Sequence, residues 1–448
     1  MENVFTIRNA FIVNEGRKYN GWITIRDGVI AQIGESGLKE PVTGKIFDAG
    51  GKLLIPGVID CHVHFREPGA TRKGDIFTES RAAAAGGVTS FMEMPNTVPQ
   101  TTTLDLLEEK CSLASAKSLV NYSFFLGATN DNIREIENAN PGIVGGVKLF
   151  FGSSTGNMLV DNAHVLEEIF ERSPVPVVAH CEDEAMIRYN SALMKEKFGE
   201  EVPVSMHPLI RSSEACYKSS EQAVKLAQKF NTRLHIAHVS TAAEMRLLEN
   251  GLPLSQKRIT AEACVHYLWF CDEDYQRLGT KIKVNPAIKT ASDREELLRG
   301  LLNNKLDIVT TDHAPHLPDE KKQSYFKAPS GTPLVQHSLP AMLEMCRLGK
   351  ITLEKVVEKM CHAPADCYNI ERRGYLRPGY FADLVIVDPQ SPWTVDPGNI
   401  LYKCGWSVFE GITFNSQVTH TFVNGNLIYE NGKFDHSFTG KRLTFNRK

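Results

Sequence analysis

The sequence predicts an α/β fold, a (β/α)8 barrel of the TIM type with a small β-sandwich domain formed by both termini. In the middle of the chain, apolar runs of strand length alternate eight times with stretches of helical periodicity, which is the count of such a barrel. The two ends instead alternate apolar and polar residues, as half-buried strands do. A length of 448 residues and a hydrophobic content of 42% allow one large core and a smaller one.

The predicted barrel domain covers residues 56–370. Its strands are expected at 57–64, 88–94, 122–127, 146–151, 175–180, 234–239, 258–263 and 306–311. Helices are expected between them, at 77–85, 104–116, 162–172, 219–229 and 294–302. In such a barrel the chemistry gathers at the carboxyl ends of the strands, so a polar motif at one of these ends is a candidate for function.

The predicted sandwich domain combines residues 1–55 with residues 371–448. Near the start, Arg26-Asp27-Gly28 separates two alternating runs and is typical of a hairpin turn. Near the other end, Ala382–Asp388 and Val418–Ile428 alternate in the same way. Because these strand-rich segments flank one long middle, we expect them to pack together.

Composition and charge exclude several classes of protein. A formal net charge of -3 predicts neither nucleic acid nor a membrane surface as the main partner. The stretch Met1–Arg8 lacks the basic and apolar regions of a signal peptide, and no apolar run approaches membrane-spanning length. The ten cysteines include no CxxC pair and are expected to be reduced core residues. A cytoplasmic protein is therefore expected.

The most informative motif follows the first barrel strand and contains His62, His64 and Arg66. Side chains alternate along a strand, so the two imidazoles point the same way and can bind one metal ion. Arg66 lies one step further on the same face and places a cation beside that ion. The alternative is a pair of buried histidines whose nitrogens are satisfied by backbone carbonyls.

Three more strand ends, and the interior of one strand, carry polar groups suited to a metal site. Strands five and six end near His180 and His238, while His235 lies earlier and is expected to face the core or the helix layer. Asp312, after the last strand, can bind a metal through one oxygen and take a proton through the other; its alternative role is a helix N-cap. Lys148 lies inside an apolar strand, which is costly unless the amine is neutralised, for example as a carbamate, or reaches the barrel rim.

Two of these segments closely resemble the signature segments of the dihydroorotase family, in the amidohydrolase superfamily. They are Asp60–Pro68 and Thr311–His316, the latter followed by Lys321. The resemblance implies metal ligands at His62, His64, His180, His238, Asp312 and Lys148, and substrate contacts at Arg66, Asn96, Asn285 and His316. It further implies two Zn²⁺ per chain, bridged by carbamylated Lys148 and a hydroxide. Some branches of the family have an aspartate in a nearby loop as the bridge instead, and the apolar strand around Lys148 favours the lysine form. Asn96 and Asn285 each stand beside a proline, so an ordinary turn is the alternative for both.

The resemblance also implies a reaction. This is the reversible cyclisation of N-carbamoyl-L-aspartate to L-dihydroorotate plus water, in de novo pyrimidine biosynthesis, by a binuclear zinc-hydroxide mechanism with Asp312 as the catalytic proton carrier. The alternatives are another cyclic-amide hydrolase (allantoinase, hydantoinase or dihydropyrimidinase) and a non-catalytic scaffold for aspartate transcarbamoylase. Arg66 favours the first reading, because hydantoin and dihydropyrimidine rings carry no exocyclic carboxylate for it to bind.

The sequence departs from the family pattern at a few places. The segment Glu262–Leu268 follows strand seven where relatives more often have Thr-Pro-His-His, Lys289 replaces a frequent arginine, and Ser330 stands where a bulkier residue is common. None of these changes removes a predicted metal ligand. A homodimer and an association with aspartate transcarbamoylase remain open at this point.

Overall fold

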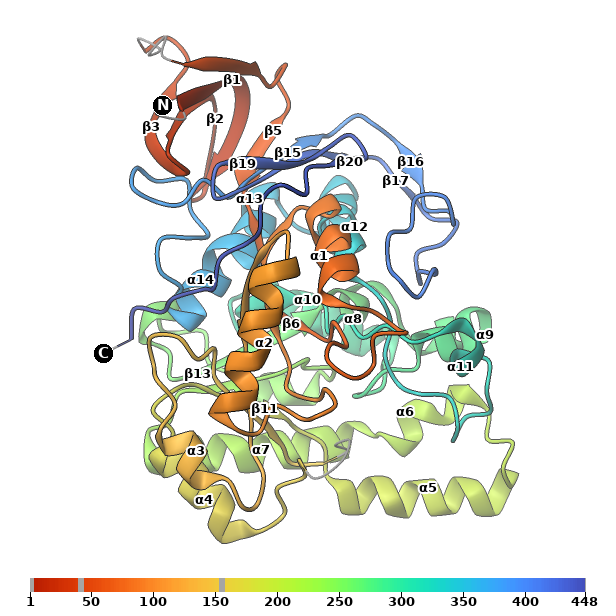
Figure 1. Ribbon diagram of the computed structural model, residues 1–448. Coiled ribbons are helices and arrows are strands. Elements are labelled where there is room, and N and C mark those ends of the chain that lie inside the picture. Colours follow the sequence, from red (N-terminus) through yellow and green to blue (C-terminus); the bar gives the residue numbers. More distant parts are fainter. Residues whose placement is uncertain (1–3, 39–43, 153–157, 448) are drawn as a thin grey trace.

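The computed structural model describes residues 4–38, 44–152 and 158–447. Figure 1 shows a large barrel with a smaller, strand-rich part beside it that contains the N-terminus. The barrel strands are β6 (Val58–Val63), β7 (Val88–Glu93), β8 (Asn121–Phe124), β9 (Leu126–Gly127), β10 (Val147–Phe150), β11 (Val177–His180), β12 (Leu234–Ile236), β13 (Ile259–Cys264) and β14 (Ile308–Thr310). Only Phe125 separates β8 from β9, so the described residues form eight staves. The predicted fold class is confirmed.

The barrel is closed by hydrogen bonds between its first and last strands. All pairings between neighbouring barrel strands are parallel. Val63 forms a parallel bridge to His313, and the His64 N–H donates to the His313 carbonyl at 2.7 Å. The Thr311 hydroxyl, just past β14, donates to Asp60 of β6 at 2.6 Å. These contacts bring the two signature segments side by side.

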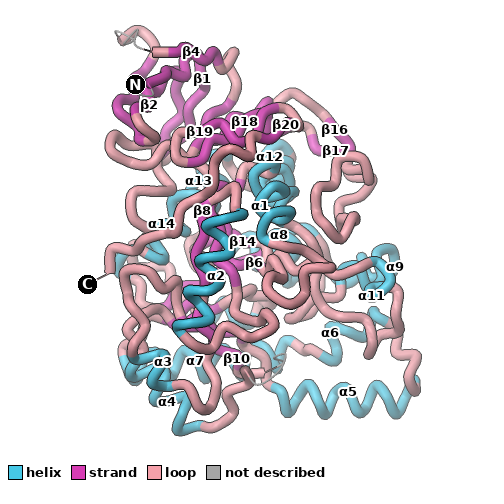
Figure 2. Tube along the Cα trace, viewed as in Figure 1, coloured by secondary structure: helices cyan, strands magenta, loops and turns pink. Residues whose placement is uncertain are grey.

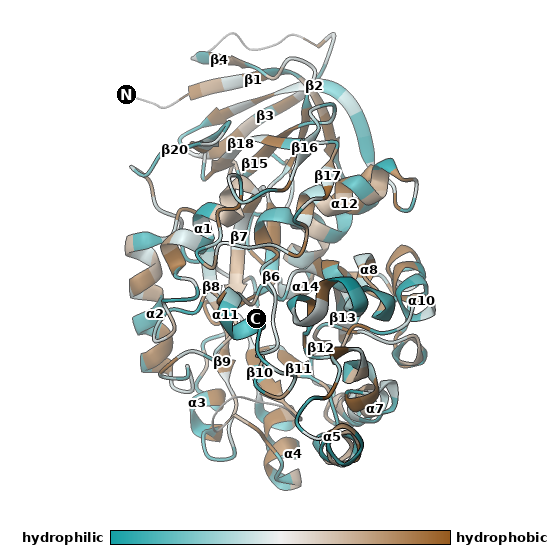
Figure 3. Ribbon diagram, turned by 90° about the vertical axis from the view of Figure 1, so that its right-hand side faces the viewer, coloured by the Kyte–Doolittle hydropathy of each residue, from teal (hydrophilic) through white to brown (hydrophobic). Residues whose placement is uncertain are grey.

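Helices surround the strands, as Figure 2 shows. Those that follow barrel strands include α1 (Ile76–Ala85), α2 (Leu104–Lys117), α4 (Ala163–Arg172), α7 (Ser213–Phe230), α10 (Ala291–Leu302) and α12 (Ser338–Arg347). Side-chain N-caps begin most of them, for example Asp75 on α1 and Thr290 on α10. On α4 the buried residues are Leu166, Ile169 and Phe170, a helical spacing that places one apolar face on the barrel. Figure 3 shows that α2 and α4 each carry both hydrophobic and hydrophilic residues.

Several helices differ from the sequence-based expectation. The predicted helix 219–229 begins earlier, at Ser213, because the Ser212 side chain caps the Ala215 N–H. Helix α5 (Glu184–Phe198) was not predicted. It buries only Ile187 among its side chains, so the apolar periodicity that marks a packed helix is weak there. In Figure 1 it projects from the barrel beside α6.

The terminal segments form one nine-stranded sheet. Its members are β1 (Val4–Asn14), β2 (Arg17–Arg26), β3 (Val29–Glu35), β4 (Lys45–Asp48), β5 (Leu53–Pro56), β15 (Leu384–Asp388), β18 (Gln417–Val423), β19 (Asn426–Glu430) and β20 (Lys433–Phe434). The central contact joins the two ends of the chain, since β5 pairs with both β1 and β15. The predicted hairpin turn lies between β2 and β3, with positive φ angles of 48° at Asp27 and 82° at Gly28.

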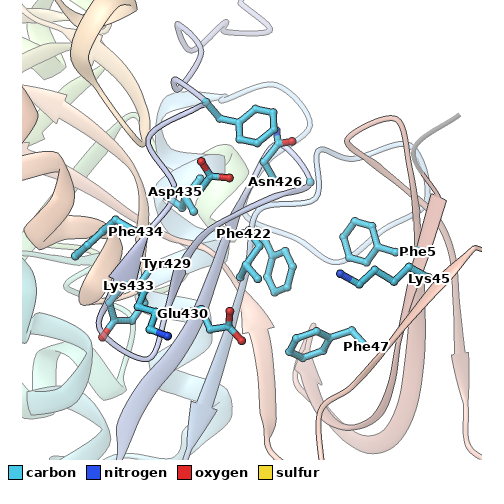
Figure 4. Close-up of a pocket in the computed structure, with 14 residues that line it drawn as sticks. Phe5, Lys45, Phe47, Phe422, Asn426, Tyr429, Glu430, Lys433, Phe434 and Asp435 are labelled. Atoms are coloured by element: carbon cyan, nitrogen blue, oxygen red, sulfur yellow. The ribbon is translucent and has the colours of Figure 1, made fainter. Parts of the chain in front are cut away.

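The sheet folds over so that its N-terminal and C-terminal halves face each other. Phe5 stacks on Phe422 with ring centroids 5.8 Å apart, and Phe47 meets Phe422 edge-on at 5.9 Å. Figure 4 shows Phe422 facing Phe5 and Phe47, and all three rings line a cavity of about 480 Å³. The packing agrees with the expected sandwich built from both termini.

The last residues leave this sheet and lie against the barrel. Tyr122 of β8 donates its N–H to the Lys441 carbonyl at 3.0 Å and accepts from the Leu443 N–H at 2.8 Å. Arg447 donates to the carbonyls of Val144 and Gly145 at 2.8 and 2.9 Å, just before β10. The division into residues 1–55 plus 371–448 and 56–370 stays a prediction, and residues 1–3, 39–43, 153–157 and 448 of it lie outside the described residues. Within the described residues, no helix combines the length and apolarity needed to cross a bilayer.

Candidate metal centre and active site

The ten predicted site residues line one cavity of about 280 Å³ at the carboxyl ends of the barrel strands. They are His62, His64, Arg66, Asn96, Lys148, His180, His238, Asn285, Asp312 and His316. They come from seven different strand ends or the loops that follow them, so only the closed barrel brings them together.

His62, His64 and Asp312 form a group that could hold a metal ion. One ligand atom from each lies within 4.8 Å of the other two. The His64 Nε2 is 3.0 Å and the His62 Nε2 is 3.3 Å from Asp312 Oδ1. Burial lowers the pKa of His64 to about 4, so its imidazole is neutral at physiological pH. Burial would raise the pKa of Asp312, but His62 and His64 outweigh it and hold that pKa below its usual range.

His180 and His238 form a second group beside the first. The His180 Nδ1 is 2.8 Å from the His238 Nε2, and the His238 ring centroid is 5.3 Å from that of His62. Burial lowers the pKa of both imidazoles. Each therefore offers an uncharged nitrogen, which is the form that binds a cation.

Lys148 lines the same cavity, and its amine is buried without a hydrogen-bond partner among the described residues. Its side chain is only 1% exposed, and among the described residues its Nζ has no hydrogen-bond partner. Burial lowers the pKa of the amine. A buried amine without a partner, among side chains that commonly bind metals, fits a lysine that is converted to a metal ligand. Its burial excludes the alternative in which the amine reaches the rim of the barrel.

Three site residues adopt a left-handed backbone conformation. Arg66, His238 and Asp312 have φ angles of 71°, 39° and 50°. Such angles are uncommon outside glycine and cost free energy, so the surrounding hydrogen bonds must hold them. The geometry aims the side chains that follow β6, β12 and β14 into the cavity.

The outer nitrogens of the histidines are held by groups that the sequence analysis did not single out. Glu262 of β13 bonds the His62 Nδ1 and also accepts from the His238 N–H at 3.0 Å. Glu182 bonds the His180 Nε2 at 2.9 Å. These contacts leave the His62 Nε2 and His180 Nδ1 directed at the cavity. Two features of the sequence could have identified them: Glu182 stands two residues after His180, and Glu262 lies within an apolar strand.

His235 and Asn96 have supporting contacts of the same kind. His235 bonds Thr260 at 2.8 Å and Glu262 at 3.2 Å, on the core side of the site, as predicted. The Asn96 Oδ1 is 2.7 Å from the His64 Nδ1, so this residue orients a predicted metal ligand as well as lining the cavity.

The hydrogen-bond pattern at the cavity mouth leaves Arg66 available to a ligand. Lys73 donates to the His316 Nδ1 at 3.1 Å, so the His316 Nε2 carries the proton and donates to the Ser330 carbonyl at 3.0 Å. The Arg66 Nη2, 3.1 Å from that Nε2, then faces a donor rather than an acceptor. Its Nε donates to the Pro315 carbonyl. Lys73 was not identified from the sequence, because nothing in its local pattern places it at the site.

The comparisons with known proteins agree with this geometry. The family model described as the amidohydrolase family matches residues 53–428. A protein named dihydroorotase from Methanosarcina acetivorans is 32% identical over 416 residues, which cover 91% of this chain and 88% of that protein. Another dihydroorotase, from Geobacter sp. (strain M21), is 32% identical over 428 residues, and the match covers 97% of that protein.

Solved structures show the same fold. The L-hydantoinase (dihydropyrimidinase) from Arthrobacter aurescens matches with a TM-score of 0.92 at 27% identity, covering 98% of this chain and 99% of that one. The dihydropyrimidinase from Brevibacillus agri NCHU1002 matches with a TM-score of 0.88 at 23% identity over 100% of both chains, which supports the fold alone. The chain belongs to the amidohydrolase family and, by its relatives in sequence, to the dihydroorotases within it.

Proposed function

We propose that the chain is a dihydroorotase that interconverts N-carbamoyl-L-aspartate and L-dihydroorotate plus water, the ring-forming step of pyrimidine synthesis. The observation that carries the substrate assignment is Arg66, whose Nη atoms have no acceptor among the described residues although the side chain lines the cavity. A planar guanidinium suits a carboxylate. Dihydroorotate carries one outside its ring.

The donors present fit two zinc ions. His62, His64 and Asp312 would hold one, His180 and His238 the other, and Lys148 would join both after its amine adds to carbon dioxide with loss of a proton. Bound there, zinc supplies Lewis acidity to the ring amide and lowers the pKa of water. The carbamate converts an orphaned amine into an anionic ligand, which removes the cost of burying it unpaired.

The chain's own groups then position the substrate and move the proton. Arg66 holds the exocyclic carboxylate, with His316 beside it and with Asn96 and Asn285 facing the ring. The Asn285 Oδ1 is buried without a partner among the described residues, so it is free to accept a ring N–H. In ring opening, Asp312 takes a proton from the attacking water and delivers it to the departing amide nitrogen; in ring closure the same proton travels back.

The second candidate function is the opening of a hydantoin or dihydropyrimidine ring. It is favoured by the match to the Arthrobacter aurescens L-hydantoinase. Those rings lack the exocyclic carboxylate and leave Arg66 without a partner. A non-catalytic scaffold for aspartate transcarbamoylase would not require the complete donor set. A homodimer and an association with that transcarbamoylase stay predictions.

The substitution Arg66→Ala tests the assignment. We expect kcat/KM for dihydroorotate to fall about 100-fold or more, since loss of a desolvated charge partner costs roughly 3 kcal/mol. Zinc measured on the same sample should be unchanged. Arg72→Ala is the matched control, an exposed arginine in the same loop, and should keep full activity.

Two results would argue against the proposal. Equal activity of the unmodified protein on dihydroorotate and on plain hydantoin or dihydrouracil would favour the second candidate. Purification without stoichiometric metal and without activity would favour the scaffold. Ring closure consumes a proton, so the assay should run towards closure in mild acid and towards opening in mild alkali.

A further inference from the structure

One wall of the cavity is a short loop segment held by a buried lysine. The segment is Pro329-Ser330-Gly331, hereafter the 329–331 wall, and all three residues line the cavity. Lys321, the last residue of α11 (Pro318–Lys321), is only 3% exposed. Its Nζ donates to the carbonyls of Pro329 and Gly331, each at 2.8 Å, and of Lys283 at 3.2 Å. Three carbonyl acceptors match the three N–H groups of one ammonium.

A second buried lysine holds the loop from the other side. Lys283 donates its Nζ to the carbonyls of Tyr325 and Ala328 at 2.7 and 2.6 Å. Its own carbonyl accepts from the Gly331 N–H at 2.9 Å as well as from Lys321. Because Lys283 stands two residues before Asn285, these bonds tie the wall to the segment that carries a predicted substrate contact.

The wall is close-packed against the metal-binding side. Gly331 has a φ of +134°, and a Cβ there would lie 2.7 Å from the Ala314 carbonyl oxygen, so only glycine fits. The Ser330 carbonyl accepts from His316. In this wall, the N–H and the hydroxyl of Ser330 have no hydrogen-bond partner among the described residues.

Two positively charged side chains lie at this end of the cavity. Arg66 lines it, and Lys73 donates to His316 and pairs with Glu320 at 3.0 Å. A cavity end of this kind attracts an anionic ligand. The open-chain substrate of the proposed reaction carries two carboxylates.

We propose that Lys321 is a positioning residue that fastens the 329–331 wall, and that Ser330 is the group through which this wall contacts the substrate. The identity of that substrate rests on the proposed function; the fastening does not. Ser330 supplies two hydrogen-bond donors towards a carboxylate or ring carbonyl, and Lys321 keeps them at a fixed distance from Arg66 and Asn285. Loosening the wall should therefore weaken substrate binding more than it slows the chemical step.

The primary test compares Lys321→Met with Lys322→Met in the zinc-loaded protein. Lys322 is exposed, and among the described residues it pairs only with Asp319, so it is a matched control. For Lys321→Met we expect KM for dihydroorotate to rise about tenfold or more, with kcat within about threefold, because a misplaced hydrogen-bonding group loses binding shared by ground and transition states. Zinc content should be unchanged. The control should match the unmodified protein.

Two further variants test the route through Ser330. Ser330→Ala should raise KM by about fivefold, the loss of one hydrogen bond. Combined with Lys321→Met it should add less than its separate effect, because both changes act through one wall. Lys321→Gln keeps two of the three donors and should lie between Lys321→Met and the unmodified protein.

A readout independent of activity keeps the fastening testable. Limited trypsin digestion compares the two variants, both metal-free. The Lys321→Met protein should be cut after Lys322 or Lys327 faster than the Lys322→Met control is cut after Lys327. If the unmodified protein turns over neither dihydroorotate nor N-carbamoyl-L-aspartate but the difference in digestion is seen, the proposed function fails and the role of Lys321 in fastening the wall stands. Equal digestion at Lys327 together with an unchanged KM overturns the proposal, and so do equal falls in kcat and zinc content.

Discussion

Lys148 is the single residue on whose chemical state the site depends most. A buried amine without a hydrogen-bond partner destabilises the metal-free protein, and in the proposed function it is converted to a carbamate. We expect Lys148→Met to abolish activity and zinc bridging, yet to raise the free energy of unfolding of the chelator-treated protein by about 2 kcal/mol. Urea unfolding of both metal-free proteins measures this difference. A less stable variant would show that the amine is hydrogen-bonded after all.

At the scale of residues, the sequence predicted candidate metal ligands that the structure brings into one cavity, and it missed the groups that orient them. Three of these candidates were recognisable because each stands at the end of an apolar strand, where burying a polar side chain without a partner is costly: His62, His180 and Asp312. Glu262 gave a similar signal, but its role depends on His62, which is distant in sequence and adjacent only in the closed barrel. The positive φ angles at His238 and Asp312 leave no mark on residue identity.

At the scale of elements, one hydrogen-bonded junction closes the barrel next to the metal centre. The Thr311 hydroxyl donates to Asp60 Oδ2 at 2.6 Å and its N–H donates to Oδ1 at 3.2 Å, which joins the end of β14 to β6. Thr311→Val removes the hydroxyl and leaves a buried carboxylate oxygen without its donor. We expect the free energy of unfolding to fall by about 2 kcal/mol.

Denaturant titration at neutral pH measures this change, and Thr413→Val is a suitable control. The Thr413 hydroxyl also bonds another side chain, Thr394, but at an exposed position. Its removal should change stability by less than about 0.5 kcal/mol. Equal effects of the two substitutions would mean that the junction adds nothing to barrel closure.

The elements themselves were predictable where burial was strong. Each barrel strand is buried on both faces and reads as an apolar run, so all eight were found within a few residues. Helix α5 escaped because only Ile187 on it is buried. The segment that carries Lys283 and the 329–331 wall is held by lysine-to-carbonyl bonds, and such bonds follow no sequence period.

At the scale of the whole molecule, a buried lysine makes stability depend on pH in the alkaline range. Lys359 is 2% exposed and donates to Asn304 and the Leu306 carbonyl, each at 3.0 Å. Burial lowers its pKa from 10.5 to about 8. Between these values the unfolded chain binds more protons than the native one, so the free energy of unfolding rises with pH across this window.

The substitution Lys359→Met should remove this rise. Relative to the variant, the unmodified protein should gain up to about 3 kcal/mol from pH 8 to pH 10.5 and show no change between pH 6 and pH 7.5. Chemical unfolding of both proteins across that range measures the difference, from which other titrating groups cancel. A difference that stays constant through pH 10 would show that Lys359 keeps its proton in the native state.

The pairing of β5 with both β1 and β15 has a consequence for biosynthesis. During translation, Leu53–Pro56 leaves the ribosome long before Leu384–Asp388 exists, so the nascent chain carries an open, apolar strand edge while the entire barrel is being made. Such an edge invites pairing with other nascent chains. Efficient production of this protein in a cell should therefore depend on chaperones that shield the early strands until Leu384–Asp388 has emerged.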